Sequence, residues 1–221
     1  MKVELGKKVD KEAESIRDHS FFLEYLKLIG MMLFAISLTT PVLGLLIFDV
    51  DTEVLSGDNV LDGQMIWDKP ILPYVAGFAI LVIHWFKFVE VNHSLKDTNV
   101  QHVILNFLFF FVLCLYPYFE MNIEFTSDQP HSRAAFSVAW GLLGVFSYLQ
   151  LRYAEKKGFL KKHLTAPRIG AIKREIIADP IVAIICVGLS YVSFTSWLVG
   201  MVVLVPVVNY VMARMSINTG N

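Results

Sequence analysis

The chain has 221 residues, of which 55% are hydrophobic and 18% are charged, and it contains 17 Phe. Its net charge of −1 gives no overall attraction to nucleic acid or to an acidic partner. Long uncharged runs exclude an ordinary soluble protein, because about 20 apolar residues in a helix cross the hydrocarbon layer of a membrane. We predict an all-α integral membrane protein with six such runs: 28–48, 71–86, 103–119, 134–151, 180–195 and 197–213.

The positions of the basic residues predict the topology. All of the 19 Lys and Arg residues except Lys69 and Arg133 lie before or at the start of the first run, or in segments that follow an even-numbered run. Basic segments stay in the cytoplasm, so we expect both termini there and the protein in the cell (plasma or inner) membrane. The predicted layout is a cytoplasmic N-terminal lead (1–27), a six-helix transmembrane domain (28–213) and a cytoplasmic tail (214–221).

The first run, LKLIGMMLFAISLTTPVL (26–43), mixes apolar residues with hydroxyls. At about 100° per residue, five uncharged side chains fall on or near one face: Ile29, Ile36, Thr39, Thr40 and Leu43. Gly30, Ser37 and Gly44 form a stripe of small residues beside this face, and such a stripe lets another helix approach closely. The mixed face suits a narrow pore with apolar constrictions and a polar ring. Alternatively, the hydroxyls bond to carbonyls of their own helix and the face only packs.

The second and third runs contain polar residues that must find partners at membrane depth. His84 lies in the second run, and His102 and Asn106 lie in the first turns of the third. The short connection brings these runs together, so we expect His84 and Asn106 to meet and bond. Interhelical packing bonds, worth about 1 kcal/mol each, are one interpretation. A proton relay is the alternative.

The connection before the fifth run is strongly basic, which favours an anchor to anionic lipid headgroups. Asp179 and Pro180 then predict the start of the fifth helix, as N-cap and first helical residue. Cys114 and Cys186 both lie inside predicted spans and are expected to pack as small apolar residues without a disulfide.

No Ser-His-Asp set, metal-ligand spacing, glycine-rich phosphate loop or haem motif stands out. We therefore predict no enzymatic activity, no catalytic residue, no metal site and no cofactor.

The second to sixth runs resemble the transmembrane protein 175 family, potassium-permeable channels of prokaryotes and lysosomes. The segment IHWFKFVEVNHSLKDTNVQHVILNFLFFFVLCLYPYF (83–119) has the residue types of the family pattern at corresponding places: His84, Phe88, Asn106 and Pro117. In the first run, FAISLTTP (34–41) is similar to the family segment FAIAITLL. However, Ile29-Gly30-Met31 stands where the family has Phe-Ser-Asp, and Tyr25 stands where it has arginine.

The resemblance implies a homotetramer in which the first helices surround one axis and let potassium or another monovalent cation flow passively. It implies that Ile36 forms a hydrophobic constriction, that Leu43 forms a further apolar ring, and that Thr39 is the hydroxyl linked to potassium preference. Two alternatives stay open. One is a non-conducting interaction or assembly protein with the same fold, and the other is a small secondary transporter that uses His84 and Asn106.

Overall fold

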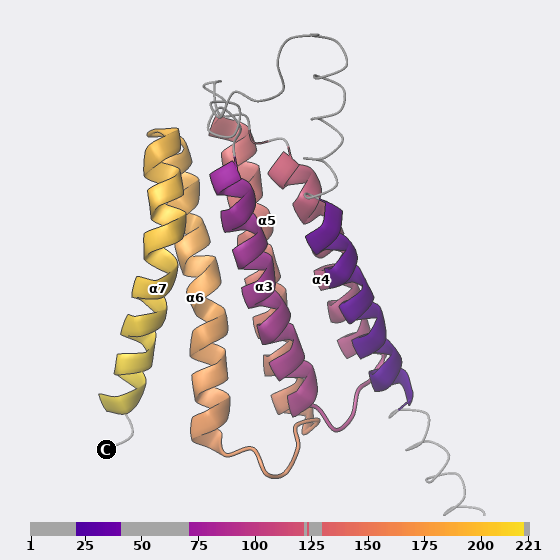
Figure 1. The fold of residues 1–221 in the computed structure, drawn as a ribbon. Helices are drawn as coiled ribbons and strands as arrows, with labels where there is room; N and C mark the ends of the chain where they lie inside the picture. The colour runs from indigo at the N-terminus through magenta and orange to yellow at the C-terminus, as the bar shows by residue number, and fades with distance from the viewer. Residues whose placement is uncertain (1–20, 41–70, 122, 124–129, 219–221) are drawn as a thin grey trace, which may run out of the picture.

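The computed structural model describes residues 21–40, 71–121, 123 and 130–218. In these ranges the chain forms helices joined by short links, with one isolated β-bridge. Figure 1 shows the helices running alongside one another, and their bounds are Phe21–Thr40 (here called the N-terminal helix), α3 (Ile71–Ser94), α4 (Val100–Met121), α5 (Pro130–Lys157), α6 (Ala166–Ser190) and α7 (Phe194–Asn218).

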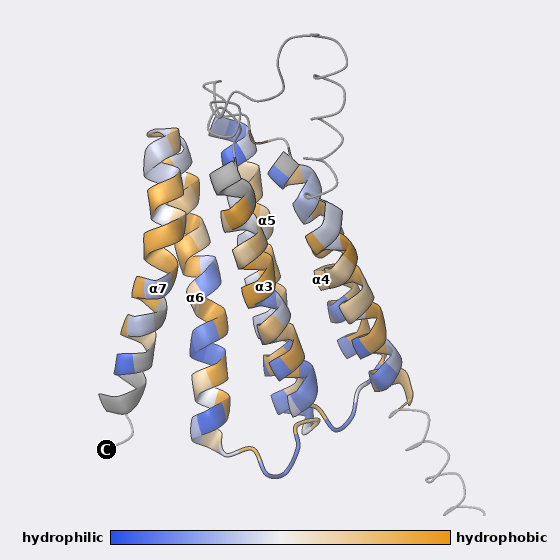
Figure 2. Cartoon of the chain, viewed as in Figure 1, coloured by the Kyte–Doolittle hydropathy of each residue, from blue (hydrophilic) through white to orange (hydrophobic). Residues whose placement is uncertain are grey.

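Five of these helices contain a stretch long and apolar enough to cross a membrane. The stretches are Phe21–Thr40, Val75–Ser94, Val100–Glu120, Pro130–Lys157 and Phe194–Met212. Helix α6 is not among the five. Figure 2 shows that its first part carries many hydrophilic residues and that its end is apolar. The predicted all-helical membrane fold is therefore confirmed for the described residues.

The helices extend beyond the predicted runs. The N-terminal helix already includes residues 21–27, which the sequence assigned to the lead, and α7 continues to Asn218, within the predicted tail. Residues 41–48 of the first predicted run, including Leu43, lie outside the described residues. The predicted runs counted only uncharged residues, whereas a helix continues past the apolar zone for as long as its backbone hydrogen bonds are made.

The predicted start of the fifth helix at Asp179 is wrong. Helix α6 begins at Ala166 after an N-cap at Thr165, and Pro180 lies inside it. A proline inside a helix removes one backbone hydrogen bond. The ring of Pro180 packs closely against α5. A Cβ atom added to Gly144 of α5 would lie 2.6 Å from Cδ of Pro180, so only glycine allows this approach.

Helix α5 occupies the centre of the bundle and packs against α4 and α6. Trp140 and Phe136 of α5 are fully buried, and the ring of Phe136 packs at an angle against those of Tyr116 of α4 and Trp197 of α7. The indole nitrogen of Trp197 donates a hydrogen bond of 2.9 Å to Oγ of Ser137. Aromatic side chains thus fill the space between three helices, with the polar indole group satisfied internally.

The N-terminal helix packs through one stripe of residues against α3 and α4. Phe34 is buried, and its ring lies 5.5 Å from that of Phe88 and 5.9 Å from that of Phe109. Oγ of Ser37 donates a hydrogen bond of 3.2 Å to the carbonyl of Leu113. Gly30 lies against Phe88, where an added Cβ atom would be only 2.2 Å from Cζ. Gly30 and Ser37 of the small-residue stripe therefore contact helices of the same chain, whereas Gly44 lies outside the described residues.

Candidate functional site: the outward face of the N-terminal helix

The side of the N-terminal helix opposite Gly30 and Phe34 is uncovered by the described residues of its own chain. It carries exposed residues three or four positions apart, and we call them the outward face: Tyr25, Leu28, Met32, Ile36 and Thr39. Ile36 is 59% exposed, although it lies close to the middle of the apolar run. A large apolar side chain left open at this depth faces either lipid or another copy of the chain.

The predicted pore residues divide between two environments. Ile36 and Thr39 lie on the outward face, and Thr40 is half-buried beside it. Ile29 packs against the core cluster of the bundle instead. The geometry therefore keeps Ile36, Thr39 and Thr40 together and separates Ile29 from them, because Ile29 immediately precedes the buried Gly30.

The two threonine hydroxyls donate hydrogen bonds within their own helix. Oγ1 of Thr39 lies 3.0 Å from the carbonyl oxygens of both Ala35 and Ile36, and Oγ1 of Thr40 lies 2.8 Å from that of Ile36. These bonds use the hydroxyl hydrogen and leave the oxygen lone pairs unused. An exposed Thr39 oxygen can therefore accept a hydrogen bond from water or contact a cation, so backbone bonding and a polar pore ring are compatible.

The predicted polar network is only partly formed. Within α4, Nδ2 of Asn106 donates to the carbonyl of His102 at 2.9 Å and lies 3.4 Å from Nδ1 of its ring. Oγ1 of Thr98 also lies 2.9 Å from this Nδ1. His84 is buried but makes no hydrogen bond to Asn106. The prediction that His84 bonds to Asn106 is therefore wrong, because the imidazole of His84 faces Asp179 of α6.

His84 lies in an ionic cluster that links α3 to α6. Nδ1 of His84 is 3.6 Å from Oδ2 of Asp179, and Nζ of Lys87 is 2.6 Å from the same oxygen. Lys87 also donates to the carbonyl of Glu175 at 3.0 Å. Because Asp179 is almost fully buried, this close pairing offsets part of the cost of removing its charge from water.

The sequence prediction missed this cluster because Asp179 was interpreted as a helix cap. One signal was available in the sequence, since His84 and Lys87 are three residues apart and therefore share a helix face. A histidine inside a predicted span and a lysine just past its end, on one helix face, together require an acidic or polar partner. Asp179 is an acid beside a later span that could supply it.

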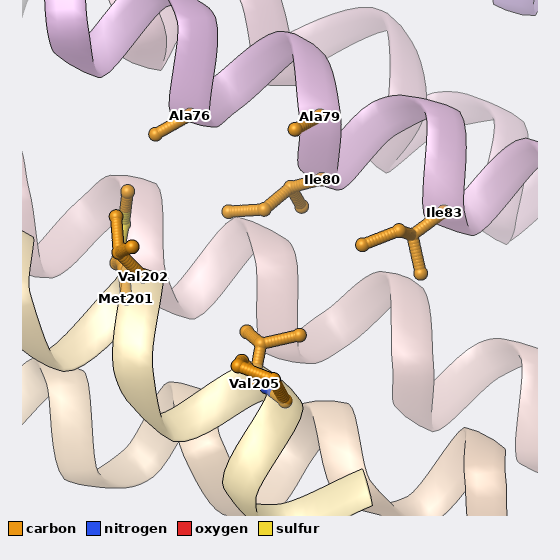
Figure 3. Close-up of a pocket in the computed structure, with 8 residues that line it drawn as sticks. Ala76, Ala79, Ile80, Ile83, Met201, Val202 and Val205 are labelled. Carbon is orange, nitrogen blue, oxygen red and sulfur yellow. The ribbon is translucent and has the colours of Figure 1, made fainter.

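An apolar groove of about 400 Å³ separates α3 from α7. Figure 3 shows side chains from the two helices directed into this space. Its lining consists of Ala76, Ala79, Ile80, Ile83, Met201, Val202, Val205 and Pro206. None of these side chains carries a charge or a hydroxyl, so the groove offers no side-chain ligand to an ion.

Part of the chain matches a known protein family. Residues 26–117 match the model of a family described as "Endosomal/lysosomal potassium channel TMEM175", and no curated protein matches the chain. The matched range begins in the N-terminal helix, includes α3 and ends within α4, so it contains Ile36 and Thr39. This match agrees with the resemblance found in the sequence, and the description of the family names a potassium channel.

Replacing Asp179 with Asn tests the ionic cluster. The variant leaves the ammonium group of Lys87 without its carboxylate partner, so we expect a loss of about 3 kcal/mol in the free energy of unfolding. Glu175→Gln is the matched control, because it lies one turn earlier and contacts Lys87 only through its backbone. Denaturant unfolding of the purified protein in detergent measures both variants. Equal stability of Asp179→Asn and the unchanged protein contradicts a structural role for the cluster.

Proposed function

We propose that this chain forms a homotetrameric potassium-permeable channel, because residues 26–117 match the model of the TMEM175 potassium channel family. Copies of the N-terminal helix surround one axis with their outward faces turned toward it. Potassium or another monovalent cation then flows passively between them. The proposed location is the cell (plasma or inner) membrane with both termini in the cytoplasm, since basic residues are concentrated in the segments assigned to that side.

The observation that carries this proposal is the position of Ile36 and Thr39 together on the outward face. A helix that only faced lipid would have no need of an exposed hydroxyl. The middle of α7 provides the contrast, because its exposed side chains from 199 to 207 are valines and one proline, and its exposed hydroxyls, Thr195 and Tyr210, lie near the ends of its apolar stretch. We therefore assign the exposed side of α7 to lipid and the outward face of the N-terminal helix to the axis of the assembly.

The two residues have different roles in the proposed mechanism. A ring of Ile36 side chains narrows the path and disfavours water, so it acts as an apolar constriction that limits flow. Thr39 lies almost one turn further along the helix, and its oxygen lone pairs replace part of the hydration shell of a passing ion. Thr40, which is half-buried, lies at the edge of this path and is a secondary contributor.

A second candidate function is coupled transport through a single protomer. The buried cluster of His84, Lys87 and Asp179 favours it, since ionisable groups at membrane depth often form ion or proton pathways. Saturable, gradient-coupled uptake distinguishes this transporter from a channel, which gives current proportional to the driving force.

Replacing Ile36 with Asn tests the constriction. The amide widens and wets the path, so we expect potassium flux into proteoliposomes to increase several-fold. Val199→Asn places the same amide on an exposed position of α7 and is expected to leave flux unchanged. Equal flux through Ile36→Asn and the unchanged protein, at equal incorporation, contradicts the assignment of Ile36 to the path.

Replacing Thr39 with Val tests the polar ring. Valine keeps the shape of threonine but removes the oxygen, so the preference for potassium over sodium should fall. Planar-bilayer recordings under opposed potassium and sodium gradients measure this preference as a reversal potential, which should move toward zero. A reversal potential identical to that of the unchanged protein counts against a role for Thr39 in selectivity.

A further inference from the structure

We propose that an acidic phospholipid with a hydroxyl-bearing headgroup, such as phosphatidylglycerol, binds where the N-terminal helix, the end of α3 and the α5–α6 link meet. Its phosphate lies between the ammonium groups of Lys27 and Lys161, and its acyl chains follow the apolar surface toward the bilayer. This site is separate from the proposed ion path and does not depend on conduction.

A short pairing between two links holds this region together. Leu95 and Leu160 form an antiparallel β-bridge, in which the amide of Lys96 donates to the carbonyl of Phe159 at 2.8 Å. The amide of Lys161 donates to the carbonyl of Ser94 at 2.9 Å. The α5–α6 link is thereby fixed beside the last turn of α3.

The N-terminal helix reaches the same place. Leu23 is buried and belongs to one apolar cluster with Leu95 and Ala154, against which Leu160 packs. Lys27 lies one turn further along this helix. Its side chain is therefore brought to the same end of the bundle as Lys161.

A cavity of about 130 Å³ lies beside Lys27. The N-terminal helix and α3 line it with Lys27, Met31, Phe88, Val89, Asn92 and His93. The polar residues of both helices lie at one end of this set. Met31 and Val89, which follow toward the middle of the two antiparallel helices, are partly exposed and apolar. This order matches a phospholipid, which has a charged headgroup and apolar chains.

The charges at the polar end favour an anion. Among the described residues, no carboxylate lies within ion-pair distance of Lys27 or Lys161. A phosphate between the two lysines makes two attractions, each stronger than at a fully solvated surface.

Asn92 supplies an independent indication of a ligand. It is 2% exposed and lines the cavity, and its Nδ2 donates to the carbonyl of Phe88 at 2.9 Å. Its Oδ1 has no hydrogen-bond partner, although a buried carbonyl oxygen normally has one. A headgroup hydroxyl can donate to this oxygen, which favours phosphatidylglycerol over a headgroup without a hydroxyl.

Native mass spectrometry of the detergent-solubilised full chain tests the site, with palmitoyl-oleoyl phosphatidylglycerol as the probe. We expect Lys27→Gln to weaken binding of the first lipid about fivefold, the loss typical of one juxtamembrane lysine. Lys27→Arg keeps the charge and should bind like the unchanged chain. Lys156→Gln removes an exposed charge at the end of α5 and should also leave binding unchanged.

Three results overturn the proposal. The first is equal binding by Lys27→Gln and the unchanged chain, and the second is an equal loss in Lys156→Gln, which indicates a general charge effect. The third is displacement of the lipid by an equal concentration of free glycerol phosphate, which indicates a site for soluble phosphate. Tighter binding of phosphatidylglycerol than of phosphatidylcholine, lost in Lys27→Gln alone, supports it.

Discussion

The close approach of Gly30 to the ring of Phe88 fixes the rotation of the N-terminal helix about its own axis. A side chain at position 30 would overlap Cζ of Phe88, so glycine allows this contact and holds Phe34 and Ser37 against α3 and α4. Once that side faces inward, Ile36 and Thr39 must face outward, because helix residues on opposite sides cannot both be covered by the same neighbours. The proposed ion path depends on this orientation, since a different rotation would turn the Thr39 oxygen into the bundle.

The ionic contacts between helices described above join α3 to α6, not the N-terminal helix to its neighbours. This chain has Ile29-Gly30-Met31 where the resembling family has Phe-Ser-Asp, so this stretch of the N-terminal helix supplies no carboxylate to α3. The carboxylate that faces His84 and Lys87 comes instead from Asp179 of α6. Within the described residues, aromatic packing and the Ser37 hydrogen bond hold the N-terminal helix to α3 and α4, whereas an ionic cluster holds α3 to α6. The helix proposed to line the path is therefore joined to its own chain mainly by apolar contacts.

Hydrophobic run length was sufficient to predict the all-helical fold, because the bilayer requires long apolar helices and leaves few alternatives. Periodicity also placed Ile36 and Thr39 on one face, since their separation is close to one helical turn. Ile29 shows the limit of this reasoning, because its projected angle cannot reveal that Gly30 draws this part of the helix onto Phe88. The partner of His84 was missed for a related reason. The Asp-Pro pair is a common helix start, and the sequence does not show that α6 begins at Ala166 and continues through Pro180, which packs against Gly144.

The central claim is that copies of the N-terminal helix meet with Ile36 facing a shared axis, and disulfide cross-linking in native membranes tests it most directly. In a background of Cys114→Ser and Cys186→Ala, a cysteine is placed at position 36 or, for comparison, at position 199 of α7. Disulfides form only between sites whose backbones approach closely. The account predicts cross-linked dimers for the position 36 variant and monomers for the position 199 variant. Monomers at position 36, with dimers at position 199, would contradict the proposed arrangement.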